Sequence, residues 1–331
     1  MQFRRPLAAA LAIAVCLAVS PLAAQVERLP PVMPPSEVEP AWVEDGPVFE
    51  PAVVLPAPEP PPNPDRPLDA RDGFFQKLIF DSTWITPFGD DSLEVLSLEL
   101  RTVLALPVPS RQWPLVLKPG FGVHFFDGLD APDIPSQVYD SYLQFRWFRR
   151  LSPRWLIDLS VTPGVYSDFD QSSDDALRIT GHAVAMFTWS PALKLVGGVA
   201  YLNREDYRIL PAAGLIWTPT EDLKLELLIP KPELAWRLRA VGPPTDAIED
   251  WIYLAAEFGG GRWAVTRASG AEDVLFYSDV RILLGLEHKQ IRGIDSRVEI
   301  GYVFAREIEY ERQNREYDLS DGILLRAGFT Y

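Results

Sequence analysis

From residue 74 to residue 331 the chain alternates apolar and polar positions in short segments. The alternation is clearest in the last ten residues, where every odd position is apolar: Ile323, Leu325, Ala327, Phe329 and Tyr331. A period of two residues places such a set on one face of a β-strand. Arg326 and Thr330 lie on the other face, which the pattern predicts to be polar, and Leu324 shares that face.

Similar segments recur along the chain, separated by clusters of Gly, Pro, Asp and Asn. A first division gives fifteen strands, at residues 75–86, 92–105, 114–126, 137–150, 154–166, 176–189, 192–202, 206–217, 222–229, 233–241, 250–258, 261–267, 273–286, 293–306 and 322–331. Helical apolar spacing is absent over any useful length. The pattern therefore predicts an all-β, antiparallel protein.

A final strand that ends on an aromatic residue resembles that of the bacterial outer-membrane β-barrel proteins. In that class the last strand ends on Phe or Tyr and is read by the barrel-assembly machinery. The block WTPTEDLKLELLIPKPELAWRL, from Trp217 to Leu238, also resembles a hairpin of an uncharacterised family of bacterial outer-membrane β-barrels. The similarity extends from about Phe74 to Tyr331. It implies a transmembrane barrel in the outer membrane and outer-membrane lipid as a partner, but no activity.

A bacterial barrel with both ends in the periplasm needs an even number of strands, so fifteen is one too many. The error is expected at Gly259, Gly260 and Gly261, because glycines also permit a kink within one long strand. Fusing residues 250–267 gives fourteen strands, with twelve as the alternative. This division also leaves residues 306–321 as a long polar loop outside the cell.

The N-terminal residues have the layout of a secretory signal peptide. Arg4 and Arg5 precede an apolar run from Leu7 to Val19, too short to span a bilayer as a helix, and cleavage is expected after Ala24. Cys16, the single cysteine, leaves with this segment. Lipidation of Cys16 is disfavoured because Val15 precedes it where a small residue is needed. The mature chain therefore offers neither disulfides nor a thiolate metal site.

Residues 25–72 differ in composition from the rest of the chain. Fourteen prolines lie between Pro30 and Pro67, interleaved with acidic residues. Proline removes backbone donors and like charges repel, so a disordered, proline-rich periplasmic segment is predicted, with the barrel at residues 73–331. The segment is either a solvated spacer or a docking site for a periplasmic or cell-wall partner.

Charge and aromatic content narrow the functional classes. The net charge of −15 becomes −17 when Arg4 and Arg5 are removed, which argues against nucleic acid as a partner. Aromatic residues make up 11% of the chain, with ten Trp. Such a content suits the two aromatic girdles of a membrane barrel.

Charged residues of both signs fall on the predicted inner face. The lumen-facing candidates are Asp140, Arg146, Asp158, Arg178, His182, Arg208, Arg237, Arg281, Arg297 and Arg326. Interleaved charges either form ion-pair ladders that stiffen the wall or set the field of a channel constriction. The sequence leaves both possibilities open.

Signals for enzymatic or metal chemistry are weak. Pairing the two strands that flank residue 171 brings Asp158 opposite His182 and Ser160 opposite Thr180, a set that invites comparison with hydrolases. No GxSxG motif accompanies it, and the histidines lack metal-ligand spacing. Acids of the outward loops, including Asp127, Asp133 and Asp168, are expected to be solvated and do not match a calcium loop. We therefore expect no enzyme, no metal and no cofactor.

The sequence is interpreted as an outer-membrane barrel that passes a small solute or an apolar compound, a reading that rests on analogy of fold. Two alternatives remain open. One is a structural or anchoring barrel whose proline-rich arm binds a periplasmic partner. The other is a barrel enzyme acting on lipid.

Overall fold

The structure is a computed structural model that describes residues 71–331 except 90–92, 111, 129–132, 171–173, 203–208, 244–246, 292 and 313–314. The described strands belong to one compact unit, residues 63–331. The predicted signal peptide, nearly all of the proline-rich segment and Arg208 lie outside the described residues. The domain boundary near residue 72 therefore stays a prediction.

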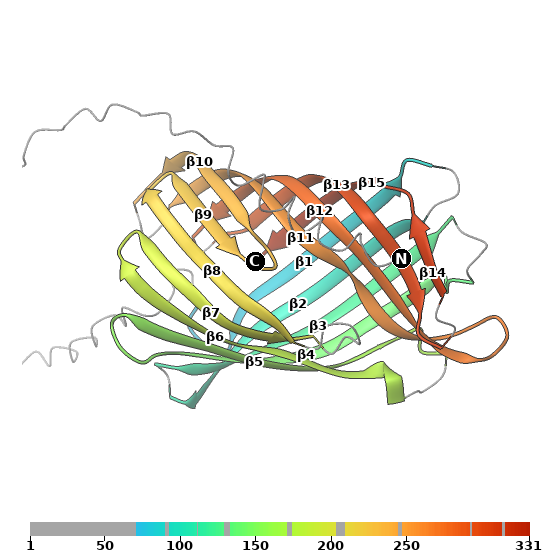
Figure 1. The fold of residues 1–331 in the computed structure, drawn as a ribbon. Helices are drawn as coiled ribbons and strands as arrows, with labels where there is room; N and C mark the ends of the chain where they lie inside the picture. The colour runs from blue at the N-terminus through green and yellow to red at the C-terminus, as the bar shows by residue number, and fades with distance from the viewer. Residues whose placement is uncertain are drawn as a thin grey trace, which may run out of the picture. The chain divides into compact units, whose positions relative to one another are not determined.

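The described strands close into a barrel (Figure 1). They are β1 (Phe75–Pro87), β2 (Glu94–Pro109), β3 (Pro114–Asp127), β4 (Gln137–Arg150), β5 (Trp155–Ser167), β6 (Leu177–Ser190), β7 (Leu193–Tyr201), β8 (Ile209–Thr220), β9 (Leu223–Leu228), β10 (Glu233–Val241), β11 (Ile248–Thr266), β12 (Glu272–Gln290), β13 (Asp295–Tyr310), β14 (Arg315–Leu319) and β15 (Gly322–Thr330). Neighbours in the chain pair antiparallel from β1 to β13, β13 pairs with β15, and β15 pairs with β1.

The prediction of a fourteen-stranded antiparallel barrel is confirmed within the described residues. Fourteen strands form the wall because β14 and β15 follow β13 in one register, with Leu319 opposite Arg306 and Gly322 opposite Val303. The fusion at the glycines is also correct, since β11 is a single strand of 19 residues. The prediction of a long loop at residues 306–321 is wrong. Most of that stretch is strand, because β13 continues to Tyr310 and pairs there with β14.

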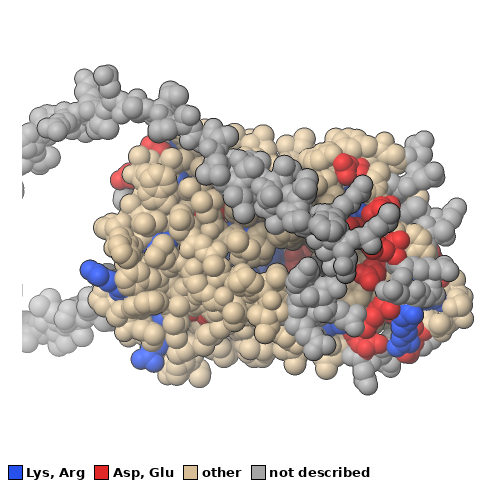
Figure 2. All heavy atoms as spheres, in the orientation of Figure 1, with Lys and Arg blue, Asp and Glu red and all other residues tan. Residues whose placement is uncertain are grey.

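The outer surface carries an apolar band between two charged ends. We call the end with Phe75 and Thr330 proximal, and the end with the β11–β12 turn distal. On the face drawn in Figure 2 the middle is mostly uncharged, and acidic side chains gather toward the end of the β11–β12 hairpin. On β15, Leu325 and Phe329 are exposed on this outer face. Such a surface favours lipid contact. No helix of the described residues is long and apolar enough to cross a membrane.

Exposed aromatic side chains form two belts on this surface. The proximal belt includes Trp155, Trp189 and Trp217, and Phe187 links the first two through ring contacts at 4.9 and 6.2 Å. The distal belt has two further ring pairs, Phe88 with Tyr302 at 6.2 Å and Tyr139 with Phe169 at 5.2 Å. Amphipathic rings at two levels are typical of a barrel that meets headgroups at both interfaces.

β11 bends across the lumen at its distal half. Gly260 has a φ of 102°, and a Cβ at this position would overlap the carbonyl oxygen of Tyr277. Beyond the bend, Ala264 pairs in parallel with Ser167 of β5, on the far side of the strands β6 to β10. The distal part of the barrel is therefore closed by the other nine strands of the wall, which are β1 to β5, β11 to β13 and the combined β14–β15.

An apolar core fills this smaller distal ring. Its buried side chains include Ile85, Val95, Phe126, Val138, Val265, Leu275, Val303, Ile308, Tyr310 and Leu324. Leu324 does face the interior, but it is 0% exposed among apolar neighbours, so the prediction of a polar environment for it is wrong. The inner face of a strand is polar only where its neighbours leave room for water. Here β11 has removed that room.

Tyr310 closes the distal core beyond the apolar outer band. Burial raises the pKa of its phenol, so the hydroxyl stays protonated and donates to the carbonyl oxygen of Asp133 at 2.9 Å. The Arg267 guanidinium lies over the Tyr310 ring, 3.7 Å from its centroid, and pairs with Asp133 at 3.2 Å. These contacts tie the β11–β12 turn to the β3–β4 connection.

Candidate functional site

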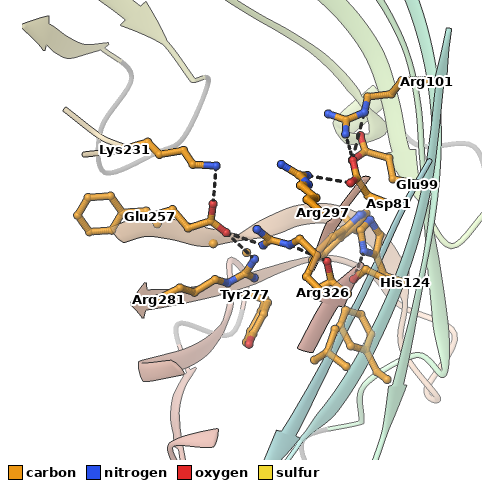
Figure 3. A pocket seen from close by; sticks show the side chains of 18 residues that line it. Asp81, Glu99, Arg101, His124, Lys231, Glu257, Tyr277, Arg281, Arg297 and Arg326 are labelled. Carbon is orange, nitrogen blue, oxygen red and sulfur yellow. Dashed lines mark hydrogen bonds and ion pairs between the residues drawn. The ribbon is translucent and has the colours of Figure 1, made fainter. Parts of the chain in front are cut away.

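A layer of charged side chains lies in the lumen directly below the distal core. Its centre is Glu257 of β11, whose carboxylate meets three cations (Figure 3). The carboxylate oxygens lie 3.1 Å from Lys231 Nζ, 3.3 Å from Arg281 Nη1 and 2.5 Å from Arg326 Nη2. Gly259, two residues after Glu257, lets the Asp279 and Arg281 side chains approach β11 closely, because they occupy the space that a Cβ there would need.

The arginines of this layer are held from behind by buried acids. Arg281 Nε donates to Asp279 at 2.6 Å, and Arg326 Nη1 donates to Glu299 at 2.7 Å. The side chains of Asp279 and Glu299 are 0% and 1% exposed. These two carboxylates neutralise the arginines without lining the open space, because they lie behind the guanidinium groups.

A second group of charges lies on β1, β2 and β13 (Figure 3). Asp81 accepts from Arg297 Nη2 at 2.8 Å and also pairs with Arg101. Glu99 accepts from the Tyr142 hydroxyl at 2.5 Å. Asp81, Glu99, Arg101 and Arg297 thus each have a polar or charged partner on the inner wall, which is the arrangement that offsets the cost of burying a charge.

These groups surround a cavity of about 340 Å³. The charged side chains that line it are five cations and three acids: Arg101, Lys231, Arg281, Arg297, Arg326, Asp81, Glu99 and Glu257. The lining is therefore richer in positive groups than in negative ones, although Asp279 and Glu299 balance the charge of the layer as a whole. A small anion that enters the cavity meets guanidinium and ammonium donors first.

The bent part of β11 separates this cavity from a second one of about 180 Å³, lined by Asp140, Arg178 and Thr180. Trp263 lines both cavities and donates from Nε1 to Asp140 at 2.6 Å. His124 Nε2 lies 3.2 Å from the same carboxylate. Asp140 thus anchors the crossing strand to the opposite wall, and Gly260 lines both cavities.

The structure places the predicted lumen residues in several groups. Arg281, Arg297 and Arg326 line the larger cavity, and Asp140 and Arg178 line the smaller one. Arg146, Asp158 and His182 form a separate cluster on β4 to β6. Arg237 lies on β10, where it pairs with Glu249 at 3.0 Å and with Asp222 at 2.8 Å. Arg208 lies outside the described residues.

The predicted pairing of Asp158 with His182 is wrong by two residues. The strand register places Ser160 opposite His182, and Asp158 opposite Val184. The turn between β5 and β6 sets this register, and a shift of two residues keeps every side chain on its face. Ser160 Oγ lies 2.8 Å from His182 Nδ1, and Asp158 lies 3.5 Å from His182 Nε2. Arg146 holds Asp158 through three donor contacts of 2.6 to 3.2 Å.

Several residues that line the cavity are not among the lumen-facing candidates predicted from the sequence. Glu257 has the inward parity of β11 and lies within the predicted strand 250–267, but it is not among the lumen-facing candidates. Asp81, Glu99 and Arg101 alternate with apolar residues on β1 and β2, so the sequence pattern already indicates that they face inward. Lys231 lies in the β9–β10 turn, and only the folded barrel shows that its ammonium group reaches Glu257.

The predicted assembly signal lies along the last strand. Ile323, Leu325, Ala327, Phe329 and Tyr331 share the outward parity of β15, and Phe329 and Tyr331 are 53% and 55% exposed. The Arg71 guanidinium lies 4.0 Å from the centroid of the Tyr331 ring. Recognition of this strand by the assembly machinery stays a prediction.

Among the described residues, one group of three acidic side chains lies close enough together to offer three ligand atoms to a metal ion. They are Glu307, Glu316 and Asp318, on the β13–β14 hairpin. The acids singled out from the sequence are placed elsewhere. Asp133 pairs with Arg267, and Asp168 accepts from the backbone N–H of Thr266 at 2.6 Å.

A family model described as "Domain of unknown function (DUF6268)" matches residues 126–317, which is 192 of the 331 residues. No curated protein matches the chain in sequence. Among solved structures the chain is similar to the KdgM porin, with 9% identity, a TM-score of 0.33, and coverage of 76% of this chain and 98% of that one.

Two further similarities are to outer-membrane proteins. A bacterial polysaccharide outer membrane secretin has 12% identity and a TM-score of 0.37, with 77% of this chain and 97% of that one covered. The Pseudomonas aeruginosa protein OccK1 has 11% identity and a TM-score of 0.30, with 78% and 99% covered. At these TM-scores the similarities carry no argument about function.

Proposed function

The chain belongs to the family described as "Domain of unknown function (DUF6268)". We propose from its geometry that it is an outer-membrane barrel that passes a small, preferentially anionic solute. The observation that carries the proposal is the cavity of about 340 Å³ with five cations and three acids in its lining. Charged groups facing a space inside the apolar band are costly and mark solute pathways.

The proposed route is not axial. The distal core fills the direct path, so the solute passes from the larger cavity to the smaller one beside Gly260 and Gly261. Trp263 and Asp140 border this passage and limit its width. A narrow, charged route supports low conductance with weak anion preference.

We propose passage rather than catalysis. Asp158 accepts hydrogen bonds from Arg146, which leaves it poorly placed to orient His182 for proton transfer. The outer membrane, its lipid and the assembly machinery follow as proposed location and partners from the apolar band and the last strand.

The test is conductance of refolded protein in planar bilayers, with reversal potentials measured across a salt gradient. The expected result is a small single-channel conductance that favours anions. Glu257→Gln should increase the anion preference, because three cations then face a neutral amide. The control is Glu221→Gln, whose side chain is 93% exposed in the proximal β8–β9 turn and should leave the ratio unchanged.

A second candidate function is favoured by the distal core itself. A barrel filled by apolar side chains is also what an anchoring or structural protein needs. Absence of conductance above that of the lipid alone would overturn passage and favour this candidate. If Glu257→Gln conducts with the same reversal potential as the unmodified protein, ions do not pass through this cavity.

A further inference from the structure

The wall of the barrel has very different heights on its two sides. β9 and β10 have six and nine residues, whereas β11 and β12 have 19 each. β10 begins at Glu233, opposite Ala255, so β11 continues for 11 residues (256 to 266) beyond its neighbour. In Figure 1, β9 and β10 stop far from the end that carries the β11–β12 hairpin. The barrel therefore has a notch above the β9–β10 turn.

The floor of this notch lies inside the apolar band. Trp217 of the proximal belt pairs with Leu225, and Ile229 at the start of the turn is four residues further on. A barrel strand tilted by about 40° advances roughly 2.5 Å along the axis per residue, which places the turn about 10 Å above that belt. The apolar band of a membrane barrel is about 25 Å tall. The turn therefore lies near mid-membrane, on the level of lipid chains.

One side of the notch is an unpaired edge of β11. The Ala256 N–H donates to Pro232 O at 3.0 Å, and the next backbone partner on this edge is the Asp168 N–H, which donates to Ala264 O at 3.2 Å. Between these two links, the described backbone gives β11 no strand partner on this side. The exposed apolar side chains of Ile229 and Phe258 lie at the rim.

The larger cavity reaches this rim. Lys231, Glu257, Phe258, Gly259 and Gly260 belong to both the rim and the cavity lining. Lys231 has the most exposed side chain of the charged residues that line the cavity, at 46%. An ammonium group at this depth needs a partner, and an accessible one marks a binding site for a charged group.

Resting on the proposed function, we infer that the cavity opens sideways into the lipid layer through this notch, and that its solute is an amphipathic anion. The apolar chain of the solute lies in the notch between Ile229 and Phe258. Its anionic head meets Lys231 first and then Arg281 and Arg326, which share Glu257 in the empty cavity. When the anionic head of the solute replaces Glu257 as the partner of these cations, the cations stay paired throughout.

The position of the notch can be tested by fluorescence quenching in bilayers. Single cysteines are introduced into the full chain carrying Cys16→Ser, and each is labelled with bimane in liposomes that contain brominated lipid. Ile229→Cys should be quenched as strongly as Leu284→Cys, which is outward and 48% exposed on β12. Ala268→Cys in the β11–β12 turn should be quenched little. Quenching at residue 229 no stronger than at residue 268 would place the turn in water and overturn the inference.

The solute class can be tested with 11-(dansylamino)undecanoate as the probe. Lys231→Gln should weaken its binding at least fivefold. Lys224→Gln is the matched control, since it removes a cation of the same hairpin that pairs with Glu226 at 2.5 Å, and it should change binding less than twofold. Undecanoate should displace the probe at far lower concentration than butyrate.

Equal weakening by the two lysine variants, or equal displacement by butyrate and undecanoate, would overturn the amphipathic anion. These failures differ from failure of the proposed function. A barrel that conducts small ions while residue 229 is in water keeps the channel and loses the lateral opening. A barrel that does not conduct loses the channel whatever the quenching shows.

Discussion

The distal core and the charged layer below it are built from the same inward positions of neighbouring strands, yet one excludes charge and the other concentrates it. Leu324 and Arg326 are successive inward residues of β15. Leu324 is 0% exposed among apolar side chains, whereas Arg326 bridges Glu257 and Glu299. The difference comes from β11, which lies against the core above its glycines and leaves a cavity below them.

The core also shows how a charge is accommodated without a cavity. Arg306 is 1% exposed and donates to the Tyr277 hydroxyl at 3.1 Å, to Ser320 O at 3.0 Å and to Leu93 O at 2.5 Å. These acceptors are fixed parts of the protein, so Arg306 holds strands together. In the charged layer the acceptors include Glu257, which faces open space.

The largest effect is expected from Leu324→Arg. It removes a buried leucine and places a charge among apolar side chains, which together should cost more than about 5 kcal/mol and greatly lower the yield of refolded protein. Leu325→Arg, on the lipid face, should cost about 2 to 4 kcal/mol. Urea unfolding of protein refolded in lipid compares the two. Milder behaviour of Leu324→Arg would mean that the distal lumen is open to water.

Removal of one arginine from the charged layer comes next. Arg326→Gln leaves Glu257 and Glu299 with one cation fewer, and breaking a buried pair costs about 3 to 5 kcal/mol. Arg239→Gln is the control, because that side chain is 65% exposed and 3.9 Å from Asp250. Unfolding in urea should show a large loss for Arg326→Gln and almost none for Arg239→Gln. Equal losses would mean that the layer is well solvated.

The boundary between the two regions depends on the bend at Gly260. Gly260→Ala needs an alanine at a φ of 102° with its Cβ against Tyr277 O, and such strain costs about 1 to 3 kcal/mol. Gly197→Ala on β7 has open space around its Cβ and should be nearly neutral. The free energies of unfolding of the two variants, measured under the same conditions, test this difference. If neither variant changes the free energy of unfolding, the bend does not require a glycine at residue 260.

The smallest effect is expected from Trp263→Phe. It keeps an aromatic ring in the core but removes the donor to Asp140, a loss of about 1 to 2 kcal/mol. Conductance should rise if the Trp263 contact narrows the passage. His288→Phe on the proximal end also removes a contact to an acid, Asp250 at 2.6 Å, and should leave conductance unchanged. The same conductance in both variants would mean that the contact between Trp263 and Asp140 does not limit the passage of ions.

Local periodicity was enough to give the strands and their faces, and the resemblance to outer-membrane β-barrel proteins implied that they close into a barrel. A period of two residues fixes which face of a strand is apolar. The requirement for an even strand number showed that fifteen was one too many, and the tolerance of glycine for a kink within a strand located the error at the three glycines. The outward parity of Leu325 and Phe329 and the inward parity of Arg281 and Arg326 could be read from the chain alone. Each of these features depends on neighbours in sequence.

The contents of the lumen depended on contacts between distant residues. The surroundings of Leu324 were predicted to be polar because parity says only that its side chain faces inward. Nothing near it in sequence shows that β11 crosses the lumen at that level. Lys231 and Glu257 meet because β9 and β10 are short and β11 is long. Sequence determined the strands and their faces, since these are properties of one segment. Only the tertiary structure decided where water enters, because that depends on which segments fill the same space.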